Sequence, residues 1–166
     1  MNAHACHDPP AISVRPAALT SPEASALIAA LNVELEGRYP EPGATHFRLD
    51  EAEVQAGRGA FLVAYRDGEP VGCGALRKLD ATTAELKRMY VAPAARRLGV
   101  SKRILDALEA EARTLGVARL VLETGVRQPE ALGLYAGAGF TPAAKFGDYV
   151  DSPLSVCLEK HLVPLP

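Results

Sequence analysis

Cysteine is scarce in this sequence, which has only Cys6, Cys73 and Cys157 among its 166 residues. The three lie far apart, and no two have the spacing of a zinc-binding pair or of a disulfide framework. We therefore expect free thiols in a reducing cytoplasm, with Cys73 and Cys157 as buried strand residues rather than nucleophiles. No metal site is expected, because the histidines are also scattered; they are His4, His7, His46 and His161.

Long apolar runs and an excess of positive charge are missing as well. No uninterrupted apolar stretch reaches the roughly 18 residues of a membrane-spanning helix, and none near the N-terminus resembles a signal peptide. The formal net charge is -2 and the pI is near 6.1, so no overall basic field draws the chain onto nucleic acid or anionic lipid. These absences favour a soluble cytoplasmic protein whose partners include neither nucleic acid nor a membrane.

The length and the hydrophobic content of 48% allow one sizeable core and are small for two ordinary domains. We expect a flexible leader over residues 1–10 and a single domain over residues 11–166. A homodimer is compatible with the sequence, since symmetric dimers are the commonest homo-oligomers.

Local signals along the chain predict alternating strands and helices. Ser21 before Pro22 is typical of a helix start, and Asp67-Gly68 supplies the positive backbone angles of a tight hairpin turn. This order predicts an α/β fold, with helices packed against a mixed sheet. The expected elements are a strand over 11–15, a helix over 21–39, a brief helix over 49–56, hairpin strands over 60–65 and 71–76, a strand over 84–91, a helix over 101–115, a strand over 119–123, a helix over 129–138 and two closing strands within 145–162.

The most informative segment joins a strand end at Val91 to a helix start at Ser101 through a short basic turn. Such a turn aims several backbone N–H groups and the positive end of the helix at one point, which suits a phosphate or pyrophosphate. Gly99 would let the backbone approach an oxygen closely. By itself, the segment fits an ordinary helix start with solvated arginines equally well. The motifs of nucleotide-triphosphate and dinucleotide loops are absent from the sequence.

Three segments in order resemble the GNAT superfamily of N-acetyltransferases. Arg96 and Gly99 match the signature Arg/Gln-x-x-Gly-x-Gly/Ala, and Ser101 departs from it at the last position. Residues 85–91 resemble the family's fourth strand, and residues 134–140 resemble its Leu-Tyr-x-x-x-Gly-Phe segment. The resemblance implies a mixed, mostly antiparallel sheet that is splayed between strands 4 and 5, with acetyl-CoA as cofactor.

The same resemblance implies which residues hold the cofactor. Main-chain groups of Met89 and Val91 would hold the pantetheine arm and the acetyl carbonyl, and the turn would hold the pyrophosphate. Gln128 stands where the family often has asparagine. The cofactor residues implied in this way are Met89, Tyr90, Val91, Arg96, Arg97, Leu98, Gly99, Val100, Ser101, Lys102, Gln128 and Ala131.

Acetyl transfer to an amine needs a neutral nitrogen and a proton for the departing thiolate. Tyr135 stands in the place of the family's general acid, or it is a core tyrosine beside Phe140. Glu85 lies on the strand expected to face the acceptor and could take the ammonium proton directly or through water. Its alternative is a strand-edge ion pair with Lys87 or Arg88. Tyr135 and Glu85 are therefore the expected catalytic residues.

Further residues are expected near the acceptor. Glu123 ends a central strand, where crevices of α/β sheets occur, and is a second candidate base or a cap of the next turn. Phe146 and Tyr149 could receive a cation with their rings, or belong to an ordinary turn. These three are the expected acceptor contacts.

Three basic residues could bind an acceptor's carboxylate, although surface solvation explains them equally well; they are Arg77, Lys87 and Arg88. We expect an acetyl-CoA-dependent N-acetyltransferase that acts by direct attack of a small-molecule primary amine, with an amino-acid-like molecule as one option. The alternatives are a non-catalytic acyl-CoA-binding regulatory module and a protein-lysine acetyltransferase.

Overall fold

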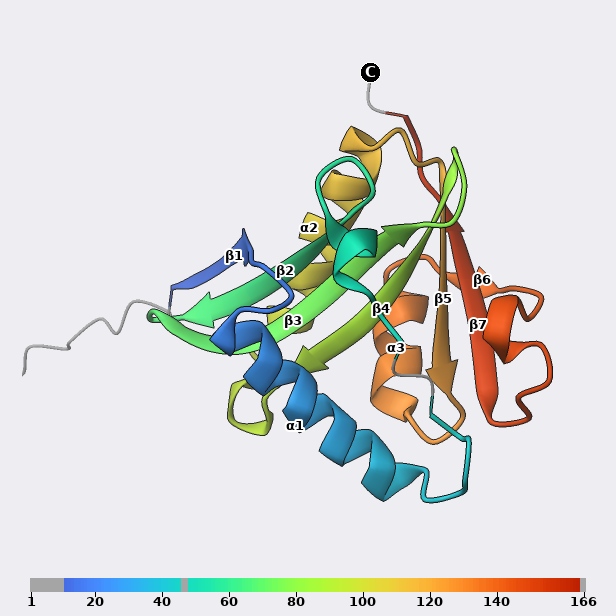
Figure 1. The fold of residues 1–166 in the computed structure, drawn as a ribbon, viewed down its shortest axis with the longest axis horizontal. Coiled ribbons are helices and arrows are strands. Elements are labelled where there is room, and N and C mark those ends of the chain that lie inside the picture. Colours follow the sequence, from blue (N-terminus) through green and yellow to red (C-terminus); the bar gives the residue numbers. More distant parts are fainter. Residues whose placement is uncertain (1–10, 46–47, 165–166) are drawn as a thin grey trace, which may run out of the picture.

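The computed structural model describes residues 11–45 and 48–164, so the expected leader lies outside the described residues. Within them, seven strands form a sheet in the order β1-β2-β3-β4-β5-β7-β6. This architecture confirms the expected α/β class (Figure 1). The elements are β1 (Ile12–Pro16), α1 (Pro22–Arg38), η1 (Glu51–Val54), β2 (Gly59–Arg66), β3 (Glu69–Lys78), β4 (Thr83–Val91), η2 (Pro93–Ala95), α2 (Val100–Thr114), β5 (Arg119–Gly125), α3 (Pro129–Gly137), β6 (Thr141–Pro142), η3 (Gly147–Tyr149) and β7 (Ser155–His161).

Local signals act as the sequence indicated at two places. The Ser21 hydroxyl accepts a hydrogen bond of 3.2 Å from the Ala24 amide and caps α1. Asp67 and Gly68 have φ angles of 50° and 84°, which close the β2–β3 hairpin. None of the helices in the described ranges is long and apolar enough to cross a bilayer.

The sheet separates between its two central strands. β4 and β5 are the parallel pair, and their pairing ends at Leu86 and Leu122 although both strands continue. Figure 1 shows the two strands diverging from this point, with α3 behind the gap. The expected splay between strands 4 and 5 is therefore present.

A β-bulge explains the divergence. Cys73 pairs with Tyr90 but Ala75 pairs with Lys87, so β4 carries one extra residue against β3. Arg88 lies in this bulge with a left-handed φ of 58°. Because a bulge bends its strand and increases the local twist, it turns the end of β4 away from β5.

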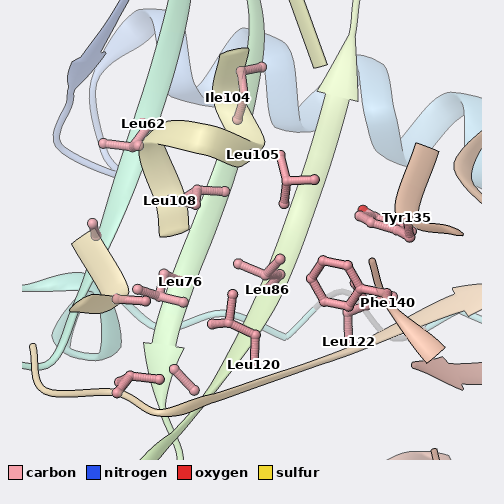
Figure 2. Close-up of a cluster of buried hydrophobic side chains, with 14 of the residues drawn as sticks. Leu62, Leu76, Leu86, Ile104, Leu105, Leu108, Leu120, Leu122, Tyr135 and Phe140 are labelled. Carbon is pink, nitrogen blue, oxygen red and sulfur yellow. The ribbon is translucent and has the colours of Figure 1, made fainter. Parts of the chain in front are cut away.

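Helices cover both faces of the sheet. One core cluster joins α2 and α3 to side chains such as Leu86 and Leu122, and Figure 2 shows these side chains with Tyr135 and Phe140 at one end. A second cluster packs Leu27 of α1 on the opposite face. The gap between β4 and β5 therefore lies between two helical layers.

Two expected elements are wrong in detail. The brief helix over 49–56 is only the single 3-10 turn η1. Residues 145–162 hold one strand, β7, and its partner β6 lies upstream of them. The chain before β7 instead forms η3, which directs Tyr149 inward. Only 4% of the surface of Tyr149 is exposed. The segment that was expected to form a closing strand thus holds a tyrosine whose hydroxyl donates a buried hydrogen bond to Glu85.

Candidate active site

A cleft of about 620 Å³ opens where β4 and β5 separate. Its walls include α1 on one face of the sheet and the start of α2 and α3 on the other, so the cleft joins the two faces. This volume is typical of a small-molecule site. The lining residues are Leu31, Glu34, Leu35, Arg38, Leu86, Lys87, Arg88, Met89, Tyr90, Val91, Ala95, Arg96, Arg97, Val100, Ser101, Glu123, Thr124, Gln128, Glu130, Ala131, Leu134, Tyr135 and Tyr149.

One end of the cleft is formed by the turn that precedes α2. Arg97 and Gly99 both have left-handed φ angles, 65° and 78°. Such a turn points successive amide groups to one side, and the first amides of a helix lack acceptors one turn earlier. Along α2, Arg103 is the first residue whose amide donates to a carbonyl one turn earlier, that of Gly99 at 3.2 Å. The amides at the start of α2 before Arg103 therefore have no carbonyl acceptor one turn earlier, which is the arrangement that the expected phosphate contact requires.

The turn favours glycine at position 99 because of the backbone angle there, and not because a side chain would lack space. A Cβ atom at this position would meet no atom within 4 Å, but the left-handed φ of 78° is unfavourable for other residues. Two expected cofactor residues, Leu98 and Gly99, are not among the residues that line the cleft. Lys102 lies outside it too, and its Nζ atom pairs with Asp106 at 2.9 Å.

Arg96 links the turn to β4 and to α1 through hydrogen bonds. Its Nε atom donates to the Val91 carbonyl at 2.9 Å, and its Nη2 atom donates to both carboxylate oxygens of Glu34 at 2.8 and 3.0 Å. The side chain therefore links the turn to the end of β4 and to α1. In this arrangement Arg96 positions the turn while its charge is already paired with Glu34.

Tyr135 is both a core residue and a cleft residue. Its ring makes an edge contact with Phe140, with the ring centroids 5.5 Å apart, and only 5% of the residue is exposed. Figure 2 shows both side chains in the core cluster. No hydrogen bond of its hydroxyl is found within the described ranges. Burial, assisted by the charge of Glu123, raises the pKa of the Tyr135 phenol. The phenol therefore stays protonated and can donate a proton into the cleft.

Glu85 lies behind the cleft wall rather than in it. Only 1% of the residue is exposed, and its carboxylate accepts from Arg77 Nε at 3.0 Å and Nη2 at 2.8 Å. The other oxygen accepts from the Tyr149 hydroxyl at 2.6 Å. The ion-pair partner is thus Arg77, directly opposite on β3, rather than Lys87 or Arg88. The hairpin register between these strands was the signal that could have indicated this pair.

Glu123 lines the cleft directly, on the α1 side of the sheet, and Glu34 and Glu130 also line it. It accepts a hydrogen bond from the Ser155 hydroxyl at 2.7 Å. Gln128, not Glu123, closes the turn after β5, because its side-chain oxygen accepts from the Gly125 amide at 3.0 Å. Phe146 does not line the cleft and instead packs edge-on against Tyr149 at 5.2 Å.

Sequence reasoning missed the wall formed by α1. Leu31, Glu34, Leu35 and Arg38 follow a spacing of three and four residues, which places them on one helical face. That spacing was a usable signal, but nothing local indicated that this face would approach the basic turn. Ion pairs now hold it there, because Glu34 binds Arg96 and Arg38 binds Glu130.

Comparison with known proteins agrees with this geometry. The Acetyltransferase (GNAT) family matches residues 25–140. An IAA acetyltransferase from Azospirillum brasilense is 45% identical over 103 residues, which are 61% of this chain and 67% of that protein. A Klebsiella pneumoniae protein assigned as an acyl-CoA N-acyltransferase is 34% identical, with a TM-score of 0.79 over 92% of this chain and 98% of its own.

A GNAT acetyltransferase from Elizabethkingia anophelis, whose structure contains acetyl-CoA, shares the fold at 21% identity. Its TM-score is 0.66 over 91% of this chain and 98% of its own. The family match covers more than half of the sequence and includes both the left-handed turn and Tyr135. The chain therefore belongs to the GNAT family of acetyl-CoA-dependent N-acetyltransferases.

Proposed function

We propose that this acetyltransferase moves the acetyl group directly to the primary amine of a small molecule. The observation that carries the proposal is the cleft that joins both faces of the sheet. The left-handed turn and Tyr135 lie on one side of the gap, and Glu123 and Tyr149 lie on the other. An amine can therefore meet the thioester within the gap, without prior transfer of the acetyl group to the protein.

The thiols of the described chain support direct attack. Cys73 is fully buried, and burial raises the pKa of its thiol to about 12. Cys157 is also buried, and burial raises the pKa of its thiol. Neither lines the cleft, so neither is placed as an acetyl-carrying nucleophile.

The residues of the cleft fit acetyl-CoA. When bound, it supplies an acetyl thioester whose leaving thiolate needs a proton. We assign the pyrophosphate to the turn from Arg96 to Lys102, with its amides and left-handed residues. The apolar arm fits the gap, where Met89 and Ala131 line opposite walls. Main-chain groups from Met89 to Val91, with Gln128 nearby, would hold its polar groups.

Two residues are assigned the proton transfers. Tyr135 donates to the leaving thiolate, since its phenol stays protonated and faces the cleft. Glu123 accepts the proton of the attacking amine, directly or through water, because it is the first residue of β5 beyond the paired region and lines the cleft beside the gap. Glu85 reaches the cleft only through Tyr149, so we assign it the positioning of that hydroxyl.

The α1 wall supports a small acceptor over an extended protein segment. Glu34 pairs with Arg96 of the turn at 2.8 Å, and Arg38 pairs with Glu130 of α3. These ion pairs tie α1 to the opposite walls and narrow the groove that an extended chain would need.

The direct test is release of free CoA thiol from acetyl-CoA by the purified protein across a panel of small amines. We expect turnover with a subset of amines and an acetylated product by mass spectrometry. Tyr135→Phe is the matched control, because it removes one hydroxyl from the cleft. Tight acetyl-CoA binding without turnover on any amine would instead favour a regulatory acyl-CoA-binding module. Turnover on peptide lysines alone would favour a protein-lysine acetyltransferase.

A further inference from the structure

We infer that the acceptor carries a carboxylate beside its amine, as an α-amino acid does, and that Lys87 binds this carboxylate. The inference rests on the proposed function and names the class of substrate. Leu86 and Leu122 are the last paired residues of β4 and β5, so Lys87 and Glu123 are the first residues beyond the pair on each strand.

Both side chains lie on the same face of the sheet. Leu86 and Leu122 belong to the core under α2, and successive side chains of a strand point to opposite faces. Lys87 and Glu123 therefore point to the α1 side, and both line the cleft. A cation and an anion thus flank the opening of the gap on the face from which the acceptor would enter.

Lys87 lines the cleft without an ion pair to the described part of the chain, as Arg97 does, whereas two other cations of the cleft are paired. Arg96 is paired with Glu34, and Arg38 is paired with Glu34 and Glu130. For Lys87, by contrast, no carboxylate of the described ranges lies within ion-pair distance. A partly buried ammonium group without a partner is unfavourable, so a bound anion would stabilise it.

The nearby acids are already occupied. Both oxygens of Glu85 accept hydrogen bonds, from Arg77 and from Tyr149. Glu53 is bound by Arg77 at 2.6 Å. Burial lowers the pKa of the Lys87 ammonium group, and the Arg77 and Arg88 charges lower it further against the opposing effect of Glu85. The environment of Lys87 therefore favours an added negative charge from a ligand.

The pairing of Lys87 with Glu123 also matches the shape of an amino acid. Its carboxylate and amine are separated by one carbon, and the two side chains stand at equivalent positions on neighbouring strands. A carboxylate held by Lys87 would leave the amine directed toward Glu123 and the gap. The leucines of the α1 wall, Leu31 and Leu35, leave an apolar surface for an acceptor side chain.

The test uses matched triples: the common α-amino acids, their amides, and the amines that lack the carboxyl group. Rates are compared at equal concentrations of neutral amine, since the amides have more acidic ammonium groups. We expect wild-type kcat/KM to be at least about 10-fold higher for the acid than for the amide, as for a lost charge-assisted hydrogen bond. Lys87→Met should remove this preference, and Lys87→Arg should retain most of it.

Lys78→Met is the control, because Lys78 lies on β3 outside the cleft and bonds to the Leu115 carbonyl. It should leave the preference unchanged. If Lys87→Met fails to fold by circular dichroism, Lys87→Gln serves the same purpose. Calorimetric titration of the same acids and amides into the CoA-bound protein gives a readout independent of turnover.

The outcomes separate the inference from the proposed function. Equal rates for acids, amides and simple amines would overturn the inference and leave small-amine acetylation standing. Lys87-dependent binding of acids without turnover would refute acetylation and retain the carboxylate site. Equal loss on every acceptor in Lys87→Met would overturn the assigned role of Lys87.

Discussion

The Tyr149 hydroxyl donates a 2.6 Å hydrogen bond to Glu85, joining a residue of the cleft wall to a carboxylate buried behind it. Burial and the adjacent Glu85 charge raise the pKa of the Tyr149 phenol, so this hydroxyl remains a donor at physiological pH. Arg77 holds the other oxygen of the same carboxylate. The arrangement orients Tyr149 and removes Glu85 from direct contact with an acceptor.

Glu123→Gln should lower kcat/KM by about 100-fold or more, because it removes the carboxylate assigned to take the ammonium proton. The loss should be greatest below the pKa of the acceptor amine, where most acceptor molecules carry an ammonium proton that must be removed before attack. A pH–rate profile with one acceptor checks this expectation. Tyr149→Phe should cost less, and an equal loss in Tyr149→Phe would move the base to Glu85 acting through Tyr149.

Tyr135→Phe should lower kcat about 10-fold or more while changing acetyl-CoA affinity less than about 2-fold, since it removes a proton donor and keeps the ring packing. Because the pKa of this tyrosine is raised above its ordinary value of 10.0, the proton-bearing form persists as pH rises. The wild-type rate should therefore show no decline attributable to Tyr135 below about pH 10. Single-turnover kinetics and calorimetry measure the two quantities separately, and an unchanged kcat would remove the assigned role.

Gly99→Ala should reduce both stability and CoA affinity. A left-handed φ of 78° costs about 1–2 kcal/mol for alanine, although its Cβ has open space. Gly57→Ala is a matched control, because Gly57 has a φ of 83° and equal space but lies outside the cleft. Thermal unfolding should shift similarly in both variants, whereas calorimetry should show weaker CoA binding only for Gly99→Ala. Arg96→Ala combined with Gly99→Asp should abolish CoA retention, and normal affinity would refute the phosphate assignment.

Arg77→Met should destabilise the fold by about 3–5 kcal/mol, since it leaves a carboxylate that is 1% exposed without its cation. Denaturant unfolding measures the loss. The double variant Arg77→Met with Glu85→Met should recover much of it, because the buried carboxylate is then removed together with its cation. If the double variant were no more stable than Arg77→Met, the ion pair would not be the cause.

Much of the fold and part of the site could be predicted from local signals. Ser21 and the Asp67-Gly68 turn are short-range features with the conformation that their residues favour. The basic turn is also short-range, and its Gly99 has the left-handed angle that glycine favours. The position of Glu123 also followed from the order of strands and helices, and that of Tyr135 from the family resemblance. The closing segment could not be predicted in this way, because Tyr149 turns inward to reach Glu85, which lies 64 residues away in sequence.

By itself, the sequence determined the order of the elements, the basic turn before α2 and the family resemblance, because these depend on residues close together in the chain. Only the tertiary structure decided which carboxylates line the cleft and which helix forms its wall. Arg88 in a bulge parts β4 from β5, Arg77 withdraws Glu85, and ion pairs bring α1 against the turn. These outcomes depend on burial and on charges that meet across distant segments, which no local pattern specifies.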